Sequence, residues 1–169
     1  MSKHISFSHL GVYGVVVRKN KVLAIKKAKG PYKGKYDLPG GGLEDDELIL
    51  EALAREFKEE VGLKVKACWQ LRTFDHLCEC DYWIDPKEER KCWFRHVGMV
   101  YEVELEEGEV KKDGDGNDSL GCEWLDMDSV NLDNSSPFLF NAVGLFNAIE
   151  SVKKEGGNIA NFLLKEKVD

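Results

Sequence analysis

The chain alternates between segments with the periodicity of strands and segments with the periodicity of helices. Residues 9–18 are apolar and β-branched and predict a buried strand, which a polar turn at 19–21 separates from a second strand at 22–25. Residues 63–79 and 92–105 predict two long strands joined by a polar hairpin loop, and 121–125 predict a short strand. With one helix after the second strand and one after the last, this order is compatible with a mixed sheet flanked by helices.

Two segments predict amphipathic helices. The first runs from about Asp46 to Val61, with Asp45 or Asp46 as its N-cap. Its apolar stripe, spaced at i, i+3, i+4, i+7 and i+11, consists of Leu50, Leu53, Ala54, Phe57 and Val61. The second begins at residues 135–137, with serine as the cap and Pro137 at the first helical position, and ends at the glycines 156–157. Its apolar positions include Leu139, Phe140, Val143 and Phe146.

Three carboxylates lie beside the apolar stripe of the first helix. At roughly 100° per residue, Glu56, Glu59 and Glu60 occupy one arc of the helix surface. Like charges at i, i+4 destabilise an isolated helix, and a hard divalent cation would reverse that effect because Mg²⁺ prefers carboxylate oxygens, water and phosphates. Arg55, four residues before Glu59, can fix a glutamate by a charge-assisted hydrogen bond. An acidic, solvated helix face is the alternative interpretation.

Glycines precede and follow this helix, and together with its charged residues they form a specific sequence motif. Residues 38–42 read LPGGG and predict a sharp loop where backbone comes close to another group, and Gly62 fits a left-handed C-cap. From Gly41 through Glu47 to residues 55–63 (REFKEEVGL), the chain resembles the Nudix box at every fixed position. The resemblance, which covers about residues 8–150 of a single domain spanning 1–169, implies an α/β fold of the α/β/α sandwich type.

The resemblance also implies a reaction, the hydrolysis of a nucleoside diphosphate linked to another group with Mg²⁺ (or Mn²⁺). It implies that Glu56, Glu59 and Glu60 hold the metal, that the carbonyl of Gly41 contributes, and that Arg55 orients a ligating carboxylate. In some family members a glutamate of the box is the base, and in others it is an acidic residue of a later loop. Here that loop offers Asp118, with Asp115 and Glu123 as alternatives. Glu47 either caps the helix or pairs with Arg55.

Residues 26–37 form a polar loop rich in lysine in an otherwise acidic protein. We expect Lys27, Lys29 and Lys35 to receive phosphates or to steer an anionic substrate, and a solubilising role of an exposed loop is the alternative. The aromatic residues that could stack on a base are Phe74, Trp83, Trp93 and Phe138, and the sequence does not choose among them.

Composition narrows the class of protein. The chain has 169 residues, which suits one domain, and its net charge of −7 argues against general nucleic-acid binding. No apolar run has the length of a membrane span, and the N-terminus lacks the apolar core of a signal peptide, so we expect a cytoplasmic protein. The 5 cysteines are not arranged as C-x-x-C pairs, which disfavours a structural zinc site. A soft-metal site that includes His76 and His96 is the alternative.

The sequence indicates a class of nucleotide substrate and does not identify one compound. Residues 63–80 lack the proline that ADP-ribose hydrolases of the family carry after the box, so the chain looks more like the MutT-type branch, which acts on (d)NTPs and modified (d)NTPs. A pyrophosphatase for ADP-ribose or another nucleotide sugar is the alternative, as is a nucleotide-binding module without turnover. Family members are often dimers, so a homodimer is expected by analogy.

Overall fold

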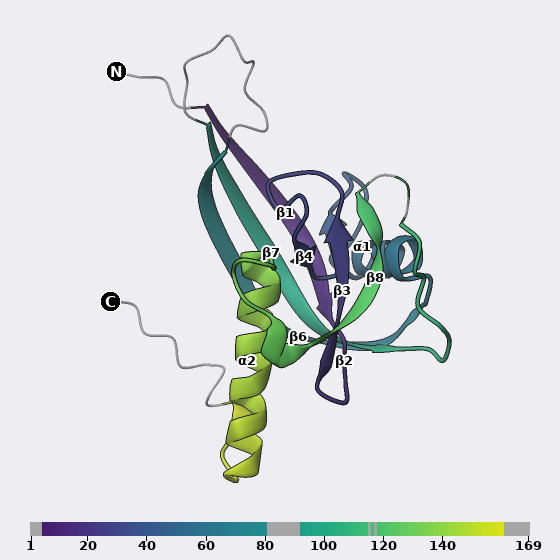
Figure 1. Cartoon of the computed structure of the whole chain (residues 1–169), viewed down its shortest axis with the longest axis vertical. Helices are drawn as coiled ribbons and strands as arrows, with labels where there is room; N and C mark the ends of the chain where they lie inside the picture. The colour runs from purple at the N-terminus through teal and green to yellow at the C-terminus, as the bar shows by residue number, and fades with distance from the viewer. Residues whose placement is uncertain (1–4, 81–91, 115, 117, 161–169) are drawn as a thin grey trace.

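The computed structural model describes residues 5–80, 92–114, 116 and 118–160 (Figure 1). The elements follow one another along the chain as β1 (Ile5–Val15), β2 (Val17–Arg18), β3 (Lys21–Lys27), β4 (Tyr36–Asp37), β5 (Gly40–Gly42), α1 (Ile49–Glu56), the π-helical turn η1 (Phe57–Val61), β6 (Val65–Cys80), β7 (Cys92–Leu105), β8 (Ser119–Asp126), the 3-10 turn η2 (Met127–Ser129) and α2 (Pro137–Lys154). The predicted strands and helices are all present, and the short strands β2, β4 and β5 add to them. The predicted hairpin loop at 80–91 lies almost wholly outside the described residues.

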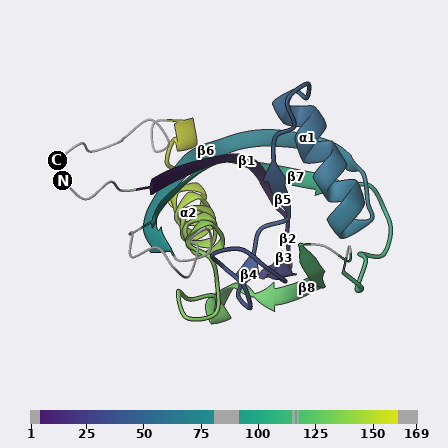
Figure 2. The same cartoon turned by 90° about the horizontal axis from the view of Figure 1, so that it is seen from above.

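The strands form two sheets. The first has the order β5-β1-β7-β6, in which β1 runs parallel to β7 while β5 and β6 pair antiparallel with their neighbours. In the second, β3 pairs antiparallel with β2, β4 and β8. Seen from above in Figure 2, α1 and α2 lie on different sides of β1. The prediction of an α/β fold with a mixed sheet flanked by helices is confirmed.

Alternate residues of β1 pack against different helices. Val12 packs with the buried residues of α1, while Tyr13 and Val15 pack with those of α2. Strand β3 repeats the pattern, with Leu23 on the side of α1 and Val22 on the side of α2. Successive side chains of a strand point to opposite faces, so residues 11–15 of β1 and 22–25 of β3, which are buried on both sides, form continuous apolar or small-residue runs.

Helix α1 begins later than predicted. Neither Asp45 nor Asp46 is its N-cap, because the helix starts at Ile49 and the side chain of Glu51 accepts a hydrogen bond from the backbone N–H of Leu48 at 2.9 Å. The preceding residues form a turn in which the N–H of Glu47 donates to a carbonyl three residues before it. This turn occupies what the sequence predicted as the first helical turn.

The buried face of α1 and η1 is also rotated from the predicted stripe. Leu53, Phe57 and Val61 are buried as expected, whereas Leu50 and Ala54 are exposed. The buried face extends instead toward Ala52 and toward the carboxylate of Glu60, which is only 2% exposed. The helix ends at Gly62, whose φ of 78° gives the predicted left-handed C-cap.

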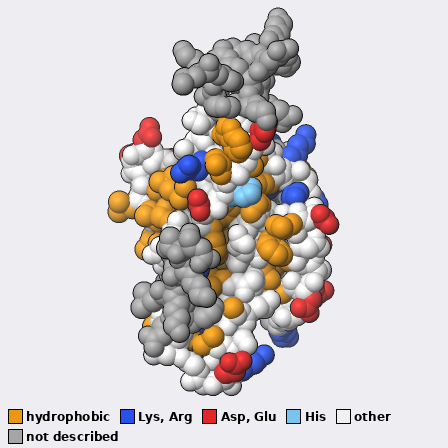
Figure 3. Space-filling model, turned by 90° about the vertical axis from the view of Figure 1, so that its left-hand side faces the viewer, with side chains coloured by type: hydrophobic (Ala, Val, Ile, Leu, Met, Phe, Trp, Pro, Cys, Tyr) orange, Lys and Arg blue, Asp and Glu red, His pale blue; other side chains and the backbone are white. Residues whose placement is uncertain are grey.

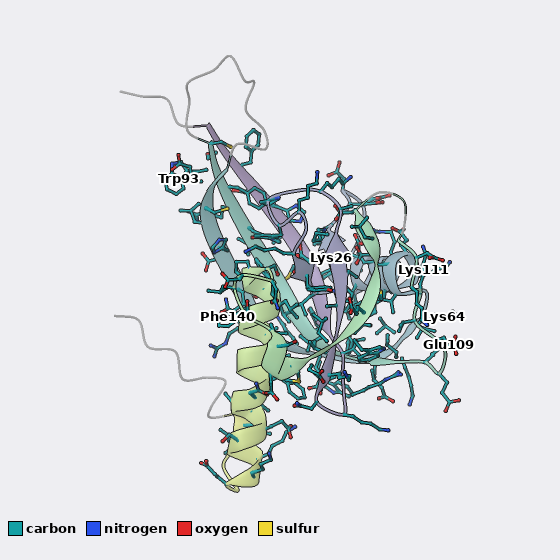
Figure 4. The ribbon with its side chains drawn as sticks, viewed as in Figure 1. Lys26, Lys64, Trp93, Glu109, Lys111 and Phe140 are labelled. Carbon is teal, nitrogen blue, oxygen red and sulfur yellow. The ribbon has the colours of Figure 1, made fainter. Side chains whose placement is uncertain are left out.

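Helix α2 starts as predicted, since the Oγ atom of Ser136 accepts a hydrogen bond from the N–H of Leu139 at 3.1 Å with Pro137 in the first turn. Of its predicted apolar positions, Phe140 is 39% exposed (labelled in Figure 4). Figure 3 shows apolar side chains on the same side of the molecule, and Leu77 of β6 is a further exposed one among the large apolar residues. Among the described residues, no helix is long and apolar enough to cross a membrane.

Candidate active site

The glycine strand β5 lies directly against helix α1. A Cβ atom on Gly41 would lie 2.8 Å from the carboxyl carbon of Glu56, so the backbone approaches this side chain more closely than any other residue type allows. Gly40 has a φ of 135°, and its N–H donates to Glu60 Oε2 at 2.9 Å. The predicted close approach of the loop is therefore present, and the group approached is the carboxylate pair of Glu56 and Glu60.

Burial makes this pair of carboxylates electrostatically unusual. Burial is the main reason that the pKa of Glu60 lies well above its ordinary value, with a further increase from the charge of Glu56, while the hydrogen bond from Gly40 opposes it. Burial likewise raises the pKa of Glu56, against the influence of Arg55. Two neighbouring carboxylates with raised pKa values form a site where a cation would relieve an unfavourable concentration of negative charge.

Arg55 holds this arrangement in place. Its Nε and Nη2 atoms donate to the two carboxylate oxygens of Glu47, each at 2.9 Å, and its Nη1 atom donates to Glu56 Oε1 at 2.8 Å. Nη2 also donates to the carbonyl of Gly42 at 3.0 Å, which ties the helix to β5. Of the two roles considered for Glu47, the structure contains the pairing with Arg55, and this hydrogen bond lowers the pKa of Glu47.

Glu59 lies apart from the buried pair. Its side chain is 53% exposed, and one of its oxygens is 3.7 Å from Arg55 Nη1. It lines a wide depression of about 900 Å³ on the outer side of α1, together with Lys64 and Lys111 (Figure 4). The Nζ atom of Lys111 donates to the backbone carbonyl of Glu59 at 3.2 Å.

The side chains around β5 form a donor set of oxygen atoms and contain no preformed metal cluster among the described residues. Within the described part of the chain, no three His, Cys, Asp or Glu side chains converge as a ready-made metal site, and this also applies to the alternative soft-metal site. Glu56 and Glu60 nevertheless supply hard oxygen donors, and the carbonyl oxygen of Gly41 lies nearby on β5, beside Gly11. Mg²⁺ is usually held by one or two carboxylates and completes its shell with water and substrate phosphates, so the residues fit such an ion.

A lysine adjoins the carboxylates. Lys27 forms an ion pair with Asp118, and its side chain is only 13% exposed. Its positive charge favours ionisation of both Glu56 and Glu60 by opposing the rise of their pKa values. Of the alternatives to Asp118, Glu123 accepts a hydrogen bond from the hydroxyl of Tyr36 at 2.7 Å, and Asp115 lies outside the described residues.

The other two lysines predicted to bind substrate separate in space. Lys29 lines the same cavity as Lys27. Lys35 instead donates to the carbonyl of Leu132 at 2.6 Å, away from that cavity. Lys26, labelled in Figure 4, lies over the ring of Tyr36 at 4.2 Å, so the lysine-rich loop divides into residues that face the cavity and residues that do not.

The cavity beside Lys27 has a volume of about 300 Å³ and aromatic walls. Its lining includes His9, Tyr13, Tyr32, Asp37, Phe94 and His96. The rings of Tyr32 and His96 are nearly parallel, with centroids 5.7 Å apart and an interplanar angle of 21°. Burial lowers the pKa of His96 to about 3, so its imidazole is neutral and forms hydrogen bonds with Tyr13 at 2.7 Å and Tyr32 at 3.3 Å.

Of the aromatic residues considered for base stacking, the three that the structure describes do not line this cavity. Phe138 packs within the α2 core with its centroid 4.0 Å from that of His96, and Phe74 packs against the same core. Trp93 lines a different depression near one end of β7, and Trp83 is outside the described residues. The cavity residues had a sequence signal, because His9 and Tyr13 lie on one face of β1, with Gly11 between them.

The sequence matches a known protein family and several curated proteins. The family model described as NUDIX domain matches residues 8–143. Relatives include an ADP-ribose pyrophosphatase of Methanocaldococcus jannaschii, 31% identical over 72% of this chain, and an 8-oxo-dGDP phosphatase of Homo sapiens, 32% identical over 59%. The aligned segments span 63% and 26% of those relatives' own lengths.

Solved structures of the same class share the fold. A MutT NUDIX hydrolase from Burkholderia pseudomallei matches with a TM-score of 0.63 and 23% identity, covering 82% of this chain and 98% of that one. A MutT protein from Methanosarcina mazei matches with a TM-score of 0.58 and 19% identity, covering 83% of this chain and 95% of that one. At these identities the likeness concerns the arrangement of strands and helices.

Proposed function

This chain belongs to the Nudix family, and from that membership we propose that it hydrolyses a pyrophosphate bond in a nucleoside diphosphate linked to another group. The substrates we propose are (d)NTPs or modified (d)NTPs. The observation that carries the proposal is the pair of Glu60, which is buried, and Glu56, which is largely buried, against a glycine strand with the ammonium of Lys27 nearby. Neighbouring carboxylates with raised pKa values cluster at functional sites, and a bound cation would compensate their charge.

Nudix hydrolases generally use divalent ions, and we propose Mg²⁺ (or Mn²⁺) here. Glu56, Glu60 and the carbonyl of Gly41 would hold it, and Glu59 would contribute from the exposed side, directly or through water. When bound, the ion neutralises phosphate charge and lowers the pKa of a water molecule. Arg55 acts as a positioning residue, because its hydrogen bond to Glu56 fixes one of the ligating oxygens.

Lys27 and Lys29 would receive the phosphates of the substrate. Lys27 is suited to this because it is largely buried and already compensates the charges of Glu56 and Glu60. A phosphate oxygen would take the place of the Asp118 carboxylate on the ammonium, since both are anionic acceptors of similar geometry. Asp118, released from this ion pair, would then be able to accept the proton of the attacking water.

The relatives divide between two substrate classes. The archaeal relative is named an ADP-ribose pyrophosphatase, whereas several others are named 8-oxo-dGDP phosphatases or 8-oxo-dGTP diphosphatases. The cavity of about 300 Å³ beside Lys27 is at the small end of ligand sites and suits one ring system. This favours a nucleoside triphosphate or diphosphate, and ADP-ribose remains the second candidate because of the archaeal relative.

The test measures phosphate and pyrophosphate release with Mg²⁺ or Mn²⁺ across canonical and oxidised (d)NTPs, ADP-ribose, dinucleoside polyphosphates and nucleotide sugars. Glu56→Gln and Glu60→Gln should lose about a hundredfold or more of the rate while keeping the fold, because each removes a charge that holds the ion. Glu104→Gln, which removes a carboxylate paired with Lys66 on the surface, is the matched control. Near-normal turnover in both site variants would overturn the assignment of the site. Binding of nucleotide without turnover by the unchanged protein would favour the non-catalytic module, and light scattering of the same samples tests the proposed homodimer.

A further inference from the structure

Asp37 is a buried carboxyl group that the proposed chemistry does not use. It lies at the end of β4, is 2% exposed and lines the aromatic cavity. Its Oδ1 atom accepts a hydrogen bond from the N–H of Leu38 at 2.8 Å and another from the Oγ of Ser136 at 2.5 Å. Both of these hydrogen bonds end on the same oxygen, and the described residues give no hydrogen bond to Oδ2, which is the carboxylate atom available to a ligand.

The hydrogen bonds around Asp37 fix the direction of this carboxyl group. The Oγ atom of Ser136 accepts a hydrogen bond from the N–H of Leu139, so its own proton is the one donated to Asp37. The N–H of Leu38 belongs to the next residue along the chain and is buried. Oδ1 is thereby held from two sides, and rotation of the carboxyl group would break both bonds.

Packing alone does not explain a carboxyl group at this position. Burial raises the pKa of Asp37 to about 6, although Ser136, Lys27 and Leu38 all favour its ionised form. A neutral Asn of nearly the same shape could accept the same two hydrogen bonds without the unfavourable burial of charge. The carboxylate therefore fits an additional partner that donates hydrogen bonds to Oδ2.

The surroundings of Asp37 define the shape of that partner. Tyr32 and His96 present nearly parallel rings, and His9 is stacked at 27° on Phe94 with centroids 6.3 Å apart. His96 is neutral, so these walls offer flat, uncharged surfaces suited to a planar ring. The positive charges of Lys27 and Lys29 also line the cavity, where they can meet an attached phosphate chain.

We propose that Asp37 selects the base of the substrate, its Oδ2 atom accepting hydrogen bonds from the adjacent N–H donors of a guanine-type ring bound in the aromatic cavity. A carboxylate has only acceptors to offer, and guanine presents N1–H and the N2 amino group side by side. Adenine presents an acceptor, N1, next to its amino group, and this acceptor would be repelled by the carboxylate. The inference rests on the proposed function, because the phosphates of the same molecule are to reach Glu56 and Glu60.

The test compares GTP with ATP, which differ in the base alone. Asp37→Asn keeps an Oδ1 acceptor for Leu38 and Ser136 and replaces Oδ2 by an amino group that donates. Asp126→Asn is the matched control, because Asp126 pairs with Lys21 on the surface. We expect the ratio of kcat/KM for GTP over ATP to fall about ten- to a hundredfold in Asp37→Asn, the range for a charge-assisted hydrogen bond, and to be unchanged in the control.

Equilibrium binding of GMP and AMP, measured by calorimetry, separates this inference from the proposed function because it needs no turnover. A preference of the unchanged protein for GMP that disappears in Asp37→Asn supports the inference even if no nucleotide is hydrolysed. A ratio that is the same in both proteins, or the absence of any preference for GMP in the unchanged protein, would overturn it. Asp37→Asn must melt cooperatively in these samples, and Asp37→Ser serves as a second variant if it does not.

Discussion

Replacing Asp37 by Asn should stabilise the metal-free protein at neutral pH. The two side chains have nearly the same shape, and the amide oxygen of Asn can accept the bonds that Leu38 and Ser136 donate to Oδ1. What the substitution removes is a charge in a group that is 2% exposed. The expected gain in the free energy of unfolding therefore comes from the charge and depends on pH.

The magnitude follows from the change in pKa. Burial raises the pKa of Asp37 from 3.8 to about 6, so the folded protein binds the proton more tightly than the unfolded chain does. Well below pH 4 the group is protonated in both states and has no effect. Between about pH 4 and pH 6 the unfolded chain loses the proton first, so ionisation progressively destabilises the fold, and above about pH 6 the loss is complete. A difference of about two pKa units corresponds to about 3 kcal/mol, or about 6–12 °C in the melting temperature of a domain of this size.

The assay is a pair of thermal melts for each protein in EDTA, one at pH 4 and one at pH 7.5. At pH 4 the unfolded chain has already lost about half of the proton, so the difference in stability between Asp37→Asn and the unchanged protein contains only about 0.5 kcal/mol from the charge. That difference should grow by about 2.5 kcal/mol in favour of the variant at pH 7.5. If it is equal at the two pH values, the carboxyl group is not destabilised by burial and the argument for a missing hydrogen-bond partner fails with it.

Three other substitutions test the site and its support. Gly41→Ala places a Cβ atom 2.8 Å from the carboxyl carbon of Glu56. It should abolish the shift in melting temperature caused by Mg²⁺, and a normal shift would contradict the close approach of β5 to Glu56. Lys27→Met should reduce kcat/KM about ten- to a hundredfold through the loss of a charge-assisted hydrogen bond to phosphate, whereas unchanged kinetics would remove this lysine from the site. Gly98→Ala brings a Cβ atom into the ring of Phe138 in α2, closer than van der Waals contact, and should destabilise the fold by about 1–3 kcal/mol in denaturant titrations. Gly144→Ala, a helical glycine whose added Cβ meets nothing within 4 Å, should not destabilise it and is the control.

Local patterns in the sequence predicted most of the fold. The strand predicted at 92–105 coincides with β7 (Cys92–Leu105), and both helix ends marked by glycine or serine are where the sequence placed them. The buried face of α1 was predicted less well, because Leu50 and Ala54 were assigned to it on hydrophobicity. Glu60 takes part of that face, and a buried carboxylate breaks the rule on which such an assignment depends.

The parts of the site that depend on residues close together in the sequence were predicted, and the part that depends on the pairing of distant strands was not. The carboxylates were predicted because their spacing on one helix and the neighbouring glycines are local features of the chain. The aromatic cavity was missed because it depends on the parallel pairing of β1 with β7, which sets His9 opposite His96. Nothing in either strand alone fixes that register. The aromatic residues considered for stacking were proposed on residue type alone, without knowledge of their neighbours, and the sequence did not choose among them.

Ser136 joins two parts of the molecule through one hydroxyl group. It caps α2 by accepting from the N–H of Leu139, and it donates its only proton to Asp37 in the wall of the cavity. The two positions are therefore not free to change separately during evolution. A descendant that exchanged Asp37 for an apolar residue would leave the Ser136 proton without its acceptor, and Asp or Asn would then serve equally well as the helix cap. A shift in the preferred base should thus leave a paired substitution at positions 37 and 136, almost 100 residues apart in the chain.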